Sequence, residues 1–260
     1  MIGRTEYDAG HYLDLRPCRP DRREHSWSTA AQYRSIVEID VGERGSRAAL
    51  AGGVFAILFV LGWLLMQQSP PLDAPAEELI DYFSDPDQRR ASLIAGLYIV
   101  PFSGIAFIWF MAALRDRYVR SGARENVLLS TVHLISGTLF VSAVFAIAAV
   151  EVALVWIAEQ SSDGTFDVES TRAMAAFASA MAQIIALRAG AVFIAVSTTR
   201  AMRSGLCPRW FGVASIVSAL ILLFSFSAVP AVTLLMPIWV VAASALVLTR
   251  RSTRDLPAGA

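Results

Sequence analysis

The sequence contains no lysine, although it carries 22 basic residues, every one of them arginine. Together with the abundant alanine, this bias is typical of a GC-rich bacterial genome. Cysteine is almost absent, and Cys18 and Cys207 are too far apart along the chain to indicate a metal motif or a disulfide framework. The three histidines, His11, His25 and His133, are scattered, so converging zinc ligands are missing. We therefore expect neither a metal site nor a cofactor.

The chain also lacks the short motifs of common enzymes. It has no GxxxxGK[ST], no HExxH and no CxxC, so no phosphate-binding loop, zinc protease or redox motif is indicated. Residues 1–47 contain no apolar h-region, and we expect no cleavable signal peptide. We expect a protein without catalytic residues, without enzymatic activity and without a nucleic-acid partner.

Apolar residues are in large excess. Of the 260 residues, 55% are hydrophobic and 17% are charged, with a mean hydropathy of +0.53, whereas soluble domains carry about a quarter charged residues. The apolar residues form long blocks separated by charged connectors, which predicts an all-α, six-helix transmembrane bundle over residues 48–249. The predicted spans are 48–67, 91–114, 127–157, 172–200, 210–227 and 231–249.

The arginines predict the orientation of this bundle. The tail at 1–47 holds eight of them, the connector after span 2 four, the connector after span 4 three and the end of the chain three, which makes 18 of the 22. Basic residues favour the cytoplasmic side, so we expect a protein of the plasma (inner) membrane with both termini in the cytoplasm. Residues 1–47 are polar and predict a disordered cytoplasmic tail, and 250–260 a short one. Besides the bilayer, the basic connectors predict contact with anionic lipid.

A short helix is predicted in one connector between the spans, and a kink is predicted inside span 2. In the connector 70–90, Asp73 is placed to cap a short helix whose apolar side, including Leu79 and Phe83, is expected to rest on the membrane surface. The run Asp85-Pro86-Asp87 is expected to close this helix. Pro101 predicts a kink near Val100 in span 2.

Arg188, Glu151 and His133 form the one ionisable constellation well inside the predicted spans. A charge in the membrane usually has a partner, a water-filled cavity or a route to the interface. Arg188 and Glu151 lean toward each other, but their α-carbons differ in depth by roughly 13 Å. Three interpretations stay open. The two residues form a structural ion pair, they line a site for a substrate, ion or proton, or Arg188 meets a partner protein or a second copy of the chain.

A serine and a histidine on adjacent spans give a further hypothesis. Ser103 and His133 are the one pair that could supply a nucleophile and its base within the membrane. Pro101 and a kink already explain the small residues around Ser103, and His133 can equally bond a neighbouring helix. The leading functional expectation is therefore a non-enzymatic structural or accessory membrane protein. A small transporter or channel with Arg188 in its path is the second, and an intramembrane enzyme the third.

A resemblance to a known group rests on several runs of residues. They are 101–110 (PFSGIAFIWF), 114–117 (LRDR), 130–132 (STV) and 136–140 (SGTLF). The segment 85–150 resembles a group of multi-pass integral membrane proteins common in actinobacteria. The resemblance implies a membrane setting, and because no activity is assigned to that group it implies no catalytic residue.

The predicted orientation can be tested directly. A cysteine introduced near Gly122, in the connector after span 2, should resist membrane-impermeant maleimide in intact cells and react after permeabilisation, because this connector carries four arginines. Cys18 and Cys207 are replaced by serine in the background, and a cysteine in the connector 158–170 serves as the outside control. Labelling near Gly122 in intact cells would overturn the orientation.

Overall fold

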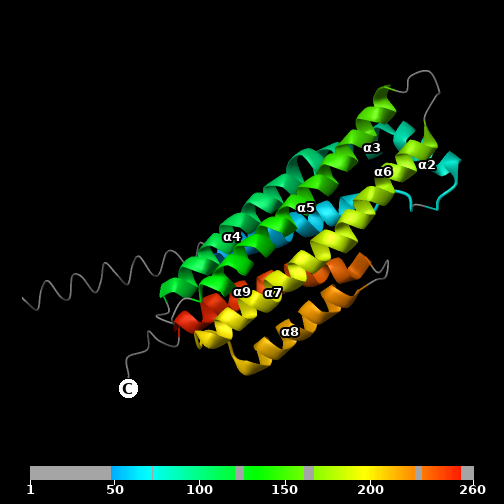
Figure 1. Cartoon of the computed structure of the whole chain (residues 1–260). Coiled ribbons are helices and arrows are strands. Elements are labelled where there is room, and N and C mark those ends of the chain that lie inside the picture. Colours follow the sequence, from blue (N-terminus) through cyan, green and yellow to red (C-terminus); the bar gives the residue numbers. More distant parts are fainter. Residues whose placement is uncertain (1–47, 72, 121–125, 161–166, 226–229, 253–260) are drawn as a thin grey trace, which may run out of the picture. The chain divides into compact units, whose positions relative to one another are not determined.

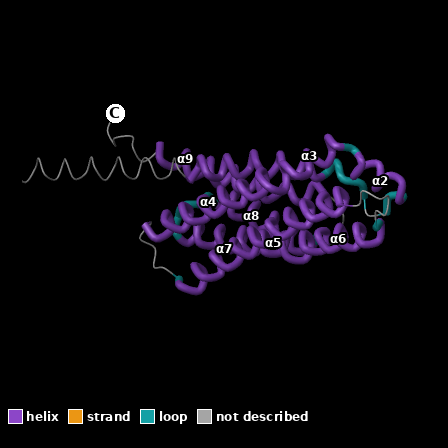
Figure 2. Tube along the Cα trace, turned by 90° about the horizontal axis from the view of Figure 1, so that it is seen from above, coloured by secondary structure: helices purple, strands orange, loops and turns teal. Residues whose placement is uncertain are grey.

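The computed structural model describes residues 48–71, 73–120, 126–160, 167–225 and 230–252. Within these ranges 91% of the residues are helical and none is in a strand, which confirms the all-α prediction. The predicted tails at 1–47 and beyond residue 252 lie outside the described residues. Figures 1 and 2 show the helices running lengthwise beside one another.

Four continuous helices are long and apolar enough to cross a membrane: Ala48–Met66, Pro86–Val119, Val127–Gln160 and Val168–Arg203. The second of them consists of α3 (Pro86–Ile94), η1 (Ala95–Ile99) and α4 (Val100–Arg120), the third is α5 (Val127–Gln160), and the fourth consists of α6 (Val168–Ala180), η2 (Met181–Ala186) and α7 (Leu187–Arg203). The predicted first four spans are thus recovered, with spans 2 and 4 starting earlier than predicted.

The predicted count of six spans is not confirmed. The last two apolar helices, Arg209–Phe224 and Ala231–Leu246, are shorter than the other four. They correspond to α8 (Arg209–Phe224) and to η3 (Pro230–Leu234) with α9 (Leu235–Ser252). A 16-residue helix such as α8 rises about 24 Å, less than a hydrocarbon core of about 30 Å. With α2 (Ala76–Ser84), the described residues form seven continuous helices.

Helix α5 is the central element of the bundle. It contacts α4, α6 and α7 along its length, and α2 and α3 at one end, while α8 packs mainly against α7. Ridges of small residues allow helices to approach closely. Small residues of the fourth long helix are used in this way, because Ala178, Ala186 and Gly190 are buried and Gly190 lies between α5 and α9.

An aromatic cluster fills the middle of the bundle. We use this name for Phe55, Phe107, Phe140, Phe193 and Trp239, which come from five different helices and are all at most 6% exposed. The ring centroid of Phe107 lies 5.0 Å from that of Phe55, 5.1 Å from that of Phe140 and 5.0 Å from that of Phe193. Aromatic pairs at these distances add stability beyond their buried area. Trp239 extends the cluster to α8 by donating a 2.9 Å hydrogen bond from Nε1 to Ser215 Oγ.

A second, smaller core lies at the end of the bundle where α2 and α3 meet α5 and α6 (Figure 1). Leu79 and Phe83 of α2 pack there against Leu154 and Val155 of α5. The prediction that the apolar side of α2 rests on the membrane is therefore wrong, because protein covers this side. We call the region formed by α2, α3, residues 151–160 and residues 168–175 the head.

The helix ends in the head differ in part from the prediction. Asp73 does not cap α2, because Pro75 occupies the N-cap position and makes no side-chain cap bond. Asp85 ends α2 as predicted, but it also starts α3, since its Oδ1 accepts a 2.9 Å hydrogen bond from the Asp87 amide. Two acidic residues, Glu77 and Glu78, stand in the first turn of α2, as the helix dipole favours.

Two of the long helices contain a π-helical segment. The first, η1, ends directly before Val100, at the place where Pro101 predicts an irregularity. Proline removes one backbone hydrogen bond and crowds the preceding turn, and a wider turn relieves both. The second, η2, ends two residues before Arg188 and contains no proline. Both segments pack against α5.

The aromatic cluster predicts a sharp contrast between two phenylalanines of α4. Phe107→Ala should lower the free energy of unfolding by about 3–5 kcal/mol, because it removes a fully buried ring and leaves a cavity. Phe102→Ala is the matched control, since Phe102 is 57% exposed toward the surroundings of the bundle. Unfolding in mixed micelles, followed by circular dichroism, measures both. Equal losses of unfolding free energy in the two variants would show that a ring of the aromatic cluster stabilises the bundle no more than an exposed ring does.

Candidate functional site

The three predicted intramembrane residues do not share one site. His133, on α5, is fully buried, and its Nδ1 lies 2.9 Å from the hydroxyl oxygen of Ser197 on α7. Its ring also lies 4.7 Å from the ring of Phe193, so it adjoins the aromatic cluster. His133 is therefore a contact between α5 and α7.

Around His133 the structure assembles a buried polar group that the sequence analysis did not find. The Tyr118 hydroxyl donates a 2.9 Å hydrogen bond to the backbone carbonyl of Ser197, and the Arg200 guanidinium lies 4.9 Å above the Tyr118 ring. Tyr118, Ser197 and Arg200 are each at most 7% exposed. This group joins the ends of α4 and α7 to the beginning of α5.

The predicted pairing of His133 with Ser103 is not what the structure contains. His133 bonds Ser197, and the buried Ser103 hydroxyl has no hydrogen-bond partner within the described residues. The distance between Ser197 Oγ and His133 Nδ1 would suit a nucleophile and its base. Both side chains are 0% exposed, however, so no substrate reaches them in this structure.

Arg188 lies on the side of α7 that carries exposed apolar residues. Ile184, at the end of η2, is 61% exposed and Val192 is 37% exposed. Arg188 itself is half-buried, and its Nη1 donates a hydrogen bond to the backbone carbonyl of Gln183 in η2. The arginine thus bonds a carbonyl of the π-helical turn next to it. A guanidinium satisfied by its own backbone is less costly in an apolar medium.

Hydrogen bonds between helices place these residues by depth. Arg115 Nε donates a 3.3 Å bond to Ser130 Oγ, which joins the last part of α4 to the beginning of α5. Because Ser197 is level with His133, Arg188 lies nine residues and Glu151 eighteen residues toward the head. Arg188 and Glu151 are thus roughly 13 Å apart along the bundle axis.

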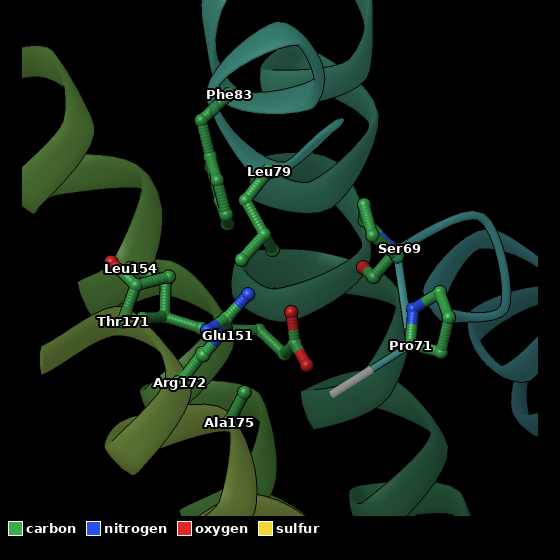
Figure 3. A pocket seen from close by; sticks show the side chains of 10 residues that line it. Ser69, Pro71, Leu79, Phe83, Glu151, Leu154, Thr171, Arg172 and Ala175 are labelled. Carbon is green, nitrogen blue, oxygen red and sulfur yellow. The ribbon is translucent and has the colours of Figure 1, made fainter. Parts of the chain in front are cut away.

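Glu151 lines a cavity of about 40 Å³ in the head (Figure 3). The cavity is also lined by Leu154, by Leu79 and Phe83 of α2, by Thr171, Arg172 and Ala175 of α6, and by Ser69, Pro70 and Pro71. Its walls are largely apolar, and the carboxylate of Glu151 points into it (Figure 3).

Arg172, not Arg188, is the arginine that shares this cavity with Glu151. Its Nη2 donates to the backbone carbonyl of Ala74, while its Nε is buried without a hydrogen-bond partner. Neither a hydrogen bond nor an ion pair joins Glu151 to Arg172 among the described residues, although Figure 3 shows their charged groups facing the same space. In the sequence Arg172 stands at the first position of the predicted span 172–200, where nothing indicates a partner for it.

The chemistry that these residues offer is limited. No group of three or more His, Cys, Asp or Glu side chains among the described residues could hold a metal ion. A carboxylate and a guanidinium at a small cavity offer binding by charge and hydrogen bonds. The cavity at Glu151 is therefore the candidate functional site, and the group around His133 is a packing contact.

Comparisons with known proteins add no functional information. No family model, no curated protein and no solved structure matches the chain. The resemblance of residues 85–150 to actinobacterial membrane proteins stays a prediction, and the function has to be argued from the geometry.

The contact between His133 and Ser197 predicts that the protein is less stable when the Ser197 hydroxyl is removed. Ser197→Ala should cost about 1–3 kcal/mol, because it leaves a buried imidazole nitrogen without its partner. Ser218→Ala is the matched control, since this half-buried serine bonds only its own helix at Ala214 and should cost less than about 0.5 kcal/mol. Unfolding of both variants in urea or SDS measures these losses. An unchanged free energy of unfolding in Ser197→Ala would show that this contact does not stabilise the bundle.

Proposed function

We propose that the chain is a six-span integral membrane protein of a bacterial plasma membrane that acts as a non-enzymatic structural or accessory component. In this proposal both termini lie in the cytoplasm and the head lies outside. The distribution of the arginines supports this orientation. The end of the bundle that carries Arg115 and Arg200 belongs to the side with 18 of the 22 arginines, and basic residues favour the cytoplasmic side.

Six spans require that α8 and the helix from Ala231 also cross the bilayer. The packing of α8 along α7 supports this, as does the bond from Trp239 of α9 to Ser215 of α8. On the surface of α8, Val213, Val217 and Phe224 are each at least 49% exposed, as expected of residues that face lipid. Local thinning of the bilayer or snorkelling of flanking residues accommodates the short length of α8.

The single observation that carries the accessory function is the aromatic cluster. Phe107 and Phe193 are both 0% exposed and occupy the middle of the bundle, where a transport path would need polar groups and water. Arg188, the arginine expected in a path, lies instead on the side with exposed apolar residues and bonds Gln183. These features favour a bundle that holds its shape and presents its surfaces to lipid and to other proteins.

The basic end of the bundle fits contact with anionic lipid. Arg203 and Arg209 are exposed there, and Trp210 beside them is 70% exposed. Tryptophan is common at the headgroup level, and arginine attracts anionic headgroups. Lipid is therefore the partner proposed for this surface.

A small-ion transporter is the second candidate, and one observation favours it. The helices on both sides of α5 contain π-helical segments, which occur often at functional sites, and α5 carries Glu151 in a cavity. Protonation of such a carboxylate is a usual step in proton-coupled transport. The third candidate, an intramembrane enzyme, is weakened by the complete burial of Ser197 and His133.

Ion flux distinguishes the first two candidates. Proteoliposomes containing the full chain and a trapped pH dye should lose an imposed pH gradient no faster than protein-free vesicles, with and without valinomycin and K⁺. Glu151→Gln and Arg188→Ala should change nothing. A protein-dependent flux that disappears in Glu151→Gln and persists in Glu159→Gln, an exposed acid of the same helix, would overturn the accessory function and support the transporter.

A further inference from the structure

The cavity at Glu151 brings together opposite charges that do not neutralise each other directly. Glu151 enters from α5 and Arg172 from α6, and no ion pair joins them among the described residues. Arg172 is held in place by its bond to the Ala74 carbonyl, which leaves its buried Nε as a donor without a partner. Buried polar atoms normally have a hydrogen-bond partner, so the protein does not fully satisfy the guanidinium of Arg172, a residue that lines the cavity.

We propose that this cavity binds a small zwitterion, that is, a primary ammonium group with an anionic group a few atoms away. The ammonium lies against the Glu151 carboxylate and the anion against the Arg172 guanidinium, so each charge meets its opposite. Charge-assisted hydrogen bonds of this kind are stronger than neutral ones. The inference goes beyond the proposed function, because binding at the head requires no transport.

The charges exclude simpler ligands. A bare cation at Glu151 would face the Arg172 guanidinium, and a bare anion at Arg172 would face the Glu151 carboxylate. In an apolar surrounding such like-charge contacts are costly. Leu79, Phe83 and Leu154 supply this surrounding, so a ligand carrying both charges is favoured over either ion alone.

The size of the cavity limits the ligand further. About 40 Å³ holds roughly three water molecules, counted at 10–15 Å³ each. A few heavy atoms fit into this space, as in the ammonium and carboxylate ends of glycine. Nucleotides, sugars and peptides are too large unless only one end enters.

The position of Glu151 leaves two sources for this chemistry. In the proposed orientation about 20 residues of α5, counted from Ser130 at the cytoplasmic end, span the hydrocarbon core, which places the cavity near the outer boundary of that core. A free α-amino acid then reaches it from the aqueous side and the headgroup of an ethanolamine phospholipid from the bilayer. Ser69 of the cavity and Tyr82 of α2 share a 3.2 Å hydrogen bond, which ties this wall to the head. The two sources share the ammonium and the nearby anion and differ in their route of entry.

The test uses the full chain in nanodiscs of phosphatidylcholine, which lacks ammonium N–H donors. Thermal unfolding is followed in a series of glycine, acetate and methylammonium, and in nanodiscs with added phosphatidylethanolamine. We expect a saturable stabilisation by glycine or by phosphatidylethanolamine. Acetate and methylammonium should each bind at least about tenfold more weakly than glycine, because each makes only one of the two charge-assisted contacts.

Variants assign the effect to the cavity. Glu151→Gln and Arg172→Gln should each weaken binding about tenfold or more, whereas Glu159→Gln and Arg209→Gln, exposed residues of α5 and α8, should leave it unchanged. A glycine response identifies a free amino acid and a lipid response a headgroup. The ligand series on the unmodified chain keeps the test valid if a variant does not fold.

Three results would overturn the proposal: no stabilisation in either arm, a response to methylammonium or Na⁺ equal to that to glycine, or equal binding by the cavity variants and their controls. The first result would mean that water alone fills the cavity. None of these results bears on the flux assay, so the accessory function and the zwitterion site can fail independently.

Discussion

Contacts among aromatic rings hold this bundle together more than any other interaction in the described residues. Water-driven burial of apolar surface is weak between helices in lipid, so close packing and hydrogen bonds must supply the association energy. Phe107 alone touches rings from three other helices, and Trp239 and His133 join polar contacts to the same set. The position of every long helix therefore depends on a few rings at the centre, and the polar groups elsewhere are arranged around a filled interior.

The sequence predicted most of the helices correctly, but it did not predict which residues meet between them. Apolar block length predicted the first four spans, and Pro101 predicted the irregularity at η1, because both depend on local properties of the chain. The count of six spans is open because α8, with 16 residues, is near the limit at which length alone decides.

The candidate site shows why contacts between helices are harder to predict from sequence than the helices themselves. Glu151 was recognised because an acid in an apolar block is unusual, but Arg172 and Ser197 were not, because each stands in a sequence context that explains it without a partner. Which residues meet depends on how far α6 and α7 are shifted along α5. That shift is determined by the aromatic cluster and by the bond from His133 to Ser197, neither of which is visible in one helix alone.

The contrast between α5 and its two neighbours has a mechanical consequence. Both neighbouring helices contain a π-helical turn, at which a helix bends most easily, whereas α5 is a regular α-helix over all 34 residues. It therefore behaves as a stiff rod with one end in the head and the other beside Tyr118 and Arg200. Bending of the bundle is therefore taken up by the helices on both sides of α5, and the spacing between Glu151 and His133 along α5 stays fixed.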